Sequence, residues 1–435
     1  MEELSILYLF LYMLIWVVVL FWHQRRRAFF DAGSFTIITY LVYSVFSFFL
    51  YLDKDVQAEF GELTLFPFVY LFFMLMLATL PVLNFDARKV DVIVDPHKNV
   101  VILIVLFFVF FSFLSIPNTL QHIQEGITLI MLESQGGKEL VQEARAEAAS
   151  MGHGGLSNLP VVLSSAFCNI GIFLFFFLLA VKKYTIIKWG LGLSILLATF
   201  SSVASGSRGG PIGIATTVVA TFFLFRYFYS NRVKKIFGYV GLFFALLLII
   251  PIISITLSRF GEEGAFSSVL DYAGQENLYF NKYGLDDNGI RYGDRTIPLF
   301  KRMIGIEGVP HNYLERRQKY PELKINDEVF YTFVGDFTID FGPFAAFILF
   351  LVFYLCVIFK TKVRNSGIHF RHLLLLHFVL CICVQGGMTL FRFADVGGNL
   401  QIIAYFLVYI YSKFTISGDR IEIQQSLKTD SKIII

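Results

Sequence analysis

The feature that most constrains this chain is a series of apolar stretches, each suited to crossing a lipid bilayer as a helix. A membrane-spanning helix needs about 20 mostly apolar residues, and short polar connections separate eleven such stretches. Charged residues make up only 16% of the chain, whereas soluble domains carry about 25%. We therefore predict an all-α polytopic membrane protein with about eleven transmembrane helices. The predicted spans are 4–22, 33–51, 64–84, 99–116, 159–181, 186–204, 211–229, 236–257, 336–359, 369–390 and 400–414.

The distribution of Lys and Arg predicts the orientation of these spans. The first stretch has no basic residue before it and no small-residue cleavage site after it, so we expect a retained helix rather than a signal peptide. One set of connections holds seventeen Lys and Arg, without the C-terminal tail, whereas the short opposite connections and loop 117–158 hold five. Because cytoplasmic connections are enriched in these residues, we predict an outer N-terminus and a cytoplasmic C-terminus.

Four regions follow from this topology. Region 1–257 holds the first eight spans and an outer loop at 117–158. Region 258–335 is a large extracytoplasmic loop, 336–414 holds the last three spans, and 415–435 is a cytoplasmic tail. From residue 259 the large loop carries ten basic and twelve acidic residues together with many Tyr and Phe. Disordered linkers lack aromatic residues, so we expect this loop to fold with short helices and to cap the membrane part.

Several classes of function are disfavoured. The four cysteines all lie inside apolar stretches, which excludes a disulfide framework, and no metal-ligand spacing is present. The chain has no P-loop and no Gly-x-Gly-x-x-Gly after a strand, and its cytoplasmic connections are too short for a nucleotide-binding domain. No Asp-x-Asp pair lies on the outer side, and no basic soluble face is interleaved with aromatics as in nucleic-acid binding. We therefore expect no cofactor, no metal and no nucleic acid.

The segment Ser205-Gly206-Ser207-Arg208-Gly209-Gly210-Pro211 interrupts two apolar stretches. An ionised side chain inside a membrane region costs a few kcal/mol, so it usually faces a polar cavity or a partner. The flanking glycines leave room for a bulky anion to approach the backbone. An ordinary polar turn with a snorkelling arginine is the alternative. We favour a functional role for Arg208, because its neighbours are small rather than merely polar.

Arginines gather on the outer side, where they match the oxygens of phosphate groups in pairs. Arg208 and Arg392 lie at the ends of spans, at the depth of a lipid phosphate, and Arg259 follows the eighth span. We predict that these three hold a diphosphate, with Arg291 and Arg295 as further phosphate contacts. The alternative is pairing with Asp and Glu of the same loop, which is favoured for Arg316 and Arg317 in the exposed-looking stretch 315–319, and Asp395 is one available partner for Arg392.

A transfer reaction also needs a base that accepts a proton. Asp336 and Asp340 are four residues apart at the start of the ninth predicted span and therefore share one helix face. Favourable placement of acids at a helix N-terminus is the simpler explanation for Asp336. Asp340 lies deeper, so we predict it as the base, with His311 in the outer loop as the second candidate. We take His377 and the other histidines of the tenth span as structural.

Three features of the sequence carry a resemblance to a known family. The chain resembles the O-antigen polymerases, the Wzy-type oligosaccharide repeat-unit polymerases. The resemblance rests on Ser205 to Gly210 at the end of a span, on the long outer loop between the eighth and ninth spans, and on the stretch Tyr331 to Gly342, which matches the family's aromatic-Asp-Phe-Gly pattern. Some members have an arginine followed by glycine eleven positions later, and this chain departs from that spacing.

The resemblance implies a metal-independent glycosyltransferase of the GT-C type in the bacterial cytoplasmic (inner) membrane. Such enzymes move a growing glycan from undecaprenyl diphosphate to a new undecaprenyl-diphosphate-linked repeat unit on the outer face, making O-antigen or a similar polysaccharide. Expected partners are these glycans, the lipid bilayer and a chain-length regulator protein. Tyr and Phe side chains of 272–331 would stack on sugars. Two alternatives stay open, an O-antigen ligase and a lipid-linked oligosaccharide transporter. A transporter would carry mid-membrane charges and an internal inverted repeat, whereas the mid-span positions are nearly free of charge.

Overall fold

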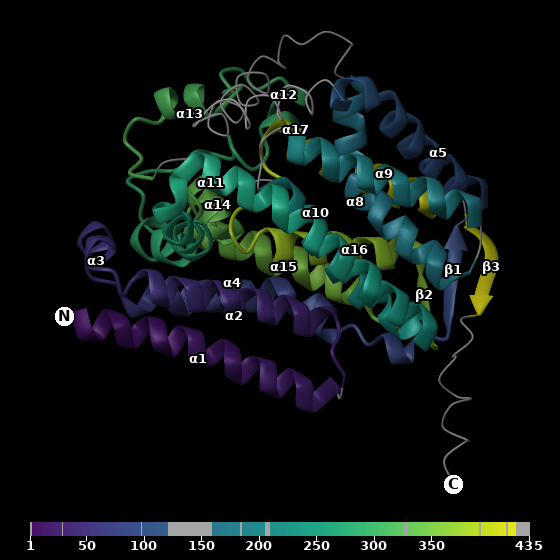
Figure 1. The fold of residues 1–435 in the computed structure, drawn as a ribbon, viewed down its shortest axis with the longest axis horizontal. Coiled ribbons are helices and arrows are strands. Elements are labelled where there is room, and N and C mark those ends of the chain that lie inside the picture. Colours follow the sequence, from purple (N-terminus) through teal and green to yellow (C-terminus); the bar gives the residue numbers. More distant parts are fainter. Residues whose placement is uncertain are drawn as a thin grey trace. The chain divides into compact units, whose positions relative to one another are not determined.

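The computed structural model describes residues 2–27, 29–96, 98–120, 159–182, 185–204, 209–325, 329–390, 393–414 and 416–422. Most of these residues are helical, and Figure 1 shows one small sheet beside the helices. The elements are α1 (Glu2–Arg27), α2 (Ala32–Leu50), α3 (Lys54–Phe60), α4 (Leu65–Asn84), η1 (Ala87–Lys89), β1 (Val92–Pro96), α5 (Lys98–Leu114), α8 (Leu159–Ala180), α9 (Thr185–Ala204), α10 (Gly209–Phe225), η3 (Arg226–Phe228), α11 (Asn231–Tyr283), α12 (Pro298–Met303), α13 (Tyr313–Lys319), α14 (Thr332–Phe341), α15 (Pro343–Thr361), β2 (Gly367–His369), α16 (Phe370–Gln385), α17 (Asp395–Phe414) and β3 (Ile416–Glu422).

Helices α1, α2, α4 and α15 form the apolar part of the first of two units, which comprises Met1–Asn84, Phe266–Thr361 and Phe378–Ile403. Trp16 of α1 is fully buried there and packs against Tyr40 of α2. The turn between α1 and α2 is fixed by Asp31, whose carboxylate accepts hydrogen bonds from the Ser34 backbone N–H and from the ring of His23, both at 2.9 Å. Capping of this kind satisfies backbone donors that a helix start leaves open.

The C-terminal part of α11 packs closely against α2 in this unit. A Cβ atom added at Gly274 would lie 2.8 Å from the backbone carbonyl of Phe46, so only glycine allows the two backbones to approach this closely. Beside it, Asn277 donates to Ser47 Oγ at 2.8 Å, and Asn281 donates to the carbonyl of Thr64 at 2.7 Å. These contacts hold the start of the large polar segment against α2 and the residue that precedes α4.

Helices α5, α8, α9 and α10 pack together in the second unit, which comprises Phe85–Ala265, Lys362–His377 and Ala404–Ile435. His377 of α16 is fully buried in it, with Thr221 Oγ1 at 2.8 Å from one ring nitrogen and Tyr405 Oη at 2.9 Å from the other. This histidine links α10, α16 and α17, and the arrangement agrees with the structural role expected from the sequence.

A three-stranded sheet in the second unit has the order β2-β1-β3. Strand β1 pairs in parallel with β2, where Ile93 lies opposite Ile368, and antiparallel with β3, where Ile93 lies opposite Ile421. Ile93 is fully buried, as expected for the β-branched sequence Val92-Ile93-Val94. Three connections that the Lys and Arg distribution assigns to the same side therefore meet in one sheet.

The helical membrane character predicted from the sequence is confirmed, because every predicted span contains a helix. Within the described ranges, six helices are long and apolar enough to cross a membrane, and Lys98–Leu114, Ile186–Ser202 and Phe370–Gln385 are shorter apolar helices. Two boundaries differ from the prediction. Helix α11 continues for 53 residues through the expected end of the eighth span, since no proline follows Pro251 until Pro298. The expected ninth span is divided at Gly342, whose φ of +81° ends α14.

Candidate functional site

Two arginines and two aspartates form a buried charge cluster between helix α14 and the polar segment that follows α11. Arg291 Nε lies 2.7 Å from Asp340 Oδ1, and Arg295 Nε lies 2.7 Å from Asp336 Oδ1. The guanidinium group of Arg291 also lies 3.8 Å from Asp336 and donates to Tyr331 Oη at 3.0 Å. The four charged side chains are at most 4% exposed. Because each sign contributes two charges, the cluster is neutral as a whole.

Asp340 accepts four hydrogen bonds in this cluster. Besides Arg291, it accepts hydrogen bonds from the backbone N–H and the hydroxyl of Thr296, at 2.7 and 2.8 Å, and from the backbone N–H of Arg295 at 3.2 Å. Removing one partner from a buried ion pair costs about 3–5 kcal/mol, because a charge is left uncompensated. Asp340 therefore fixes the path of the chain around Arg295 and Thr296.

Asp336 joins the same cluster to the connection before α17. Its Oδ2 accepts hydrogen bonds from the Leu390 backbone N–H at 2.7 Å and from the Thr389 hydroxyl at 3.0 Å. Asn399 adds a second link, since it donates to the Thr296 carbonyl at 2.8 Å and accepts from the Leu299 N–H at 3.1 Å. Thr389 and Leu390 are thus bound to the charge cluster, and Asn399 in α17 is bound to the segment that contacts Asp340.

A second set of ion pairs lies next to this cluster and is more open to water. The carboxylate of Asp294 accepts hydrogen bonds from Lys301, from Lys319 at 2.6 Å and from Tyr320 Oη at 2.8 Å. Burial alone would raise the pKa of Asp294, but the hydrogen bonds from Lys301, Lys319 and Tyr320 lower it below the usual value. We conclude that the segment is held together by charge pairing as well as by its aromatic residues.

The five predicted diphosphate-binding arginines fall into two groups. Arg208 and Arg392 lie outside the described residues, and so does the side chain of Arg259, whose backbone belongs to α11. Arg291 and Arg295 are described, and their guanidinium groups face Asp340 and Asp336 rather than a cavity lined by arginines. The predicted diphosphate contact stays a prediction for all five. Loop 117–158 also lies outside the described residues from 121 onward.

The two predicted base candidates occupy different surroundings. Asp340 is fully buried, and its two carboxylate oxygens accept the four hydrogen bonds described above. His311 is exposed, and its backbone N–H donates to the carboxylate of Glu315 at 2.7 Å before helix α13. Neither assignment as base is tested by the structure. The contacts of Asp340 favour a positioning role, because each proton it accepted would displace a hydrogen bond to a backbone or an arginine.

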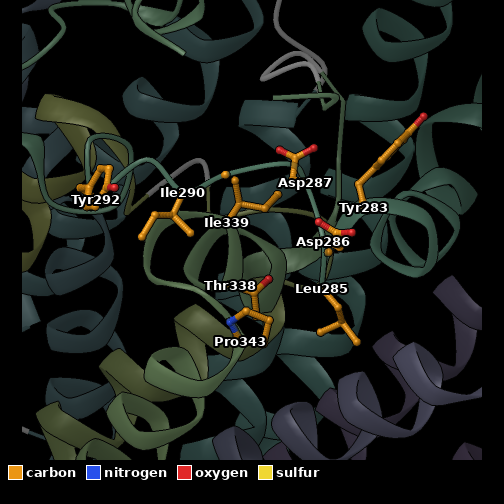
Figure 2. Close-up of a pocket in the computed structure, with 11 residues that line it drawn as sticks. Tyr283, Leu285, Asp286, Asp287, Ile290, Tyr292, Thr338, Ile339 and Pro343 are labelled. Carbon is orange, nitrogen blue, oxygen red and sulfur yellow. The ribbon is translucent and has the colours of Figure 1, made fainter. Parts of the chain in front are cut away.

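A cavity of about 320 Å³ opens beside the charge cluster, where α15 begins. Ligand-binding pockets have volumes of about 300–1,000 Å³. In the view of Figure 2, Tyr292 and Ile290 lie on one side and Asp286 on the other, with Thr338 and Pro343 between them. Pro343 is the first residue of a helix long and apolar enough to span a membrane. The cavity therefore lies at one end of a hydrophobic helix.

Asp287 also lines this cavity and was not singled out by the sequence analysis. Its side chain is buried, with Oδ1 accepting from the Ile325 backbone N–H at 2.8 Å, and Oδ2 has no hydrogen-bond partner within the described ranges. Burial raises the pKa of Asp287 to about 6, against the opposing effects of the Ile325 hydrogen bond and Arg291. The paired acids Asp286-Asp287 between two tyrosines are the sequence signal that could have identified this site.

In comparisons with known proteins, no family model, no curated protein and no solved structure matches the chain. Across the described ranges, no three His, Cys, Asp or Glu side chains gather as the ligands of a metal ion would. The chemistry of the site must therefore be inferred from its own residues.

Proposed function

We propose that this protein polymerises oligosaccharide repeat units carried on undecaprenyl diphosphate, at the outer face of a bacterial cytoplasmic membrane. The proposal includes eleven spans in a GT-C-like arrangement, an outer N-terminus and a cytoplasmic C-terminus. The observation that carries it is a polar, folded segment with a ligand-sized cavity at the end of an apolar helix, in a chain whose sequence resembles repeat-unit polymerases. Such a position lets a site reach a substrate whose lipid stays in the bilayer.

In the proposed reaction, an acceptor hydroxyl oxygen bonds to the anomeric carbon of the growing glycan. The bond from that carbon to the diphosphate oxygen breaks, and the diphosphate leaves with the electron pair. Arg208, Arg259 and Arg392 would stabilise the charge that develops on it, which is the largest electrostatic task of such a transfer. A base takes the hydroxyl proton, and the sequence-predicted candidates are Asp340 and His311.

The charge cluster has a supporting role in this scheme. Asp336 binds the backbone of Leu390, two residues before Arg392, so it positions the connection on which that arginine lies. Arg291 and Arg295 pair with Asp340 and Asp336 and offset the charge of these acids in a buried place. Besides the phosphate contact predicted for them, these two arginines would then contribute through the placement of Arg392.

The test is reconstitution of the full-length protein in liposomes with purified lipid-diphosphate-linked repeat units. We expect a ladder of glycan lengths on the lipid, unchanged by a chelator. The Arg208→Ala variant should produce no ladder, whereas Arg317→Ala, a matched loss of an exposed arginine on α13, should match the wild type. Transfer of preformed polymer to lipid A core without any ladder would identify a ligase, and movement of lipid-linked units across the bilayer without glycan transfer would identify a transporter.

A further inference from the structure

The cavity at the start of α15 has the features of a binding site for a sugar ring, and the first of them is Tyr292. This tyrosine is 65% exposed, although Arg291 and Asp294 on either side are at most 1% exposed. A large aromatic side chain at the rim of a cavity offers a flat apolar face and a hydroxyl group to a ligand. Its neighbours therefore anchor the segment while Tyr292 alone is presented outward.

The backbone at Tyr292 is held in an unfavourable conformation. Its φ of +54° lies in the left-handed region, which bulky residues rarely adopt. The segment is fixed there because the Arg291 N–H donates to the Ile339 carbonyl at 3.0 Å and Tyr320 Oη donates to the Arg291 carbonyl at 3.0 Å. Non-glycine residues held in this region cluster at ligand sites, where the surrounding structure maintains the strain.

The polar groups of the cavity define the chemistry of its ligand. Asp286 is exposed at the rim, Asp287 is 4% exposed behind it, and Thr338 provides a hydroxyl. Carboxylates accept hydrogen bonds from hydroxyl groups, and none of the described residues that line the cavity is a Lys or Arg. The two acids would repel an anionic phosphate. An uncharged ring rich in hydroxyl groups suits the cavity better, because it can stack on the aromatic ring and donate hydrogen bonds to the carboxylates on the other side.

We propose that this cavity binds an uncharged pyranose of the repeat unit, with Tyr292 stacked on the ring and Asp286 and Asp287 accepting its hydroxyl hydrogens. The inference rests on the proposed function for the identity of the glycan. It assigns the sugar to a place that Arg291 and Arg295, the two described arginines with a predicted phosphate contact, do not line.

The test measures binding separately from turnover. The probe is the lipid-free repeat-unit oligosaccharide, released by mild acid from the lipid-linked pool of the host and titrated calorimetrically into the full-length protein in nanodiscs. Tyr292→Ala and Asp286→Asn should each weaken binding roughly tenfold, as expected for loss of one aromatic or hydrogen-bonding contact of about 1.4 kcal/mol. Tyr292→Phe keeps the ring and should bind within about twofold of the wild type, and Glu307→Gln, a matched exposed acid on the same segment, should not differ from it.

Inorganic pyrophosphate should not displace the oligosaccharide. Unchanged binding by both Tyr292→Ala and Asp286→Asn, no binding by the wild type, or displacement by pyrophosphate would overturn the sugar site. These outcomes are independent of the liposome experiment. If the wild type forms the ladder while both variants bind the oligosaccharide normally, the proposed function stands and the proposed sugar site is refuted. If the wild type binds the oligosaccharide through Tyr292 but forms no ladder, the sugar site stands and the proposed function is refuted.

Discussion

The pairing of Arg291 with Asp340 predicts strong energetic coupling between these two residues. In Asp340→Leu, Arg291 would stay buried without its 2.7 Å partner, at a cost of about 3–5 kcal/mol. In Arg291→Leu, Asp340 keeps its three hydrogen bonds from Arg295 and Thr296, so we expect a smaller loss of about 2–3 kcal/mol. In the double variant Arg291 and Asp340 leave no unpaired charge between them, although the backbone N–H groups of Arg295 and Thr296 and the Thr296 hydroxyl lose their acceptor.

The double variant should therefore be less destabilised than the sum of the two single variants, with a coupling free energy of about 2–3 kcal/mol. The measurement is the free energy of unfolding in mixed detergent micelles, followed by the fluorescence of Trp16, which is fully buried in the same unit. Arg317→Leu on exposed α13 serves as the control and should change stability by less than about 0.5 kcal/mol. Single-variant losses that add within about 0.5 kcal/mol would refute the account of the cluster as one coupled network.

Two further predictions concern stability. Asp287→Asn should stabilise the protein at pH 8 by about 1–2 kcal/mol, after allowing for solvent screening of a pKa shift from 3.8 to about 6. Because the pKa of Asp287 is raised in the folded state, the wild-type protein gains stability as pH falls from about 6 towards 3.8. The stability difference between the variant and the wild type should therefore vanish near pH 4. The same difference in unfolding curves at about pH 8 and pH 4 would contradict the buried-acid explanation. Gly274→Val should lower the free energy of unfolding by about 1–3 kcal/mol in thermal unfolding, because the added side chain forces α2 away from α11. At Gly241 an added Cβ meets no atom within 4 Å, so Gly241→Ala should not destabilise the protein. Equal effects of the two substitutions would show that helix propensity, not close packing, determines the stability change.

The helices could be predicted from the sequence because apolar stretches of this length have few alternatives to helix. Breaks inside them were harder to predict. Gly342 divides α14 from α15 in a stretch that reads as one span, and α11 passes through Arg259, where an end was expected. A single glycine can lie within a helix or end it, and the neighbouring structure decides which occurs. The small sheet was missed because Gly367–His369 is too short to show a strand pattern.

The charge cluster was visible only in part. Arg291 and Arg295 are four residues apart, and so are Asp336 and Asp340. The equal spacing matches two positive side chains with two negative ones. The arginines were predicted as phosphate ligands and Asp340 as a proton acceptor, whereas the pairing of Arg291 with Asp340 and of Arg295 with Asp336 joins positions far apart in the chain and depends on the tertiary fold. Tyr292 could not be singled out among the aromatic residues of the segment, because its left-handed backbone and its exposure become evident only in the structure.

The sheet that joins β1 to β2 also limits how the chain can be threaded through a bilayer. Strands that exchange backbone hydrogen bonds lie in the same aqueous compartment, so the chain between Pro96 and Gly367 must traverse the membrane an even number of times. Of the six long apolar helices, three fall in this interval: Leu159–Ala180, Gly209–Phe228 and Pro343–Thr361. Three is odd, so a topology in which all three cross the membrane requires a full passage by at least one other segment of the interval. The candidates are the shorter apolar helices α5 and α9 and the first half of α11. With these three added to the three long helices, the interval has six passages. Six is even, so the topology agrees with the sheet without any reference to charge.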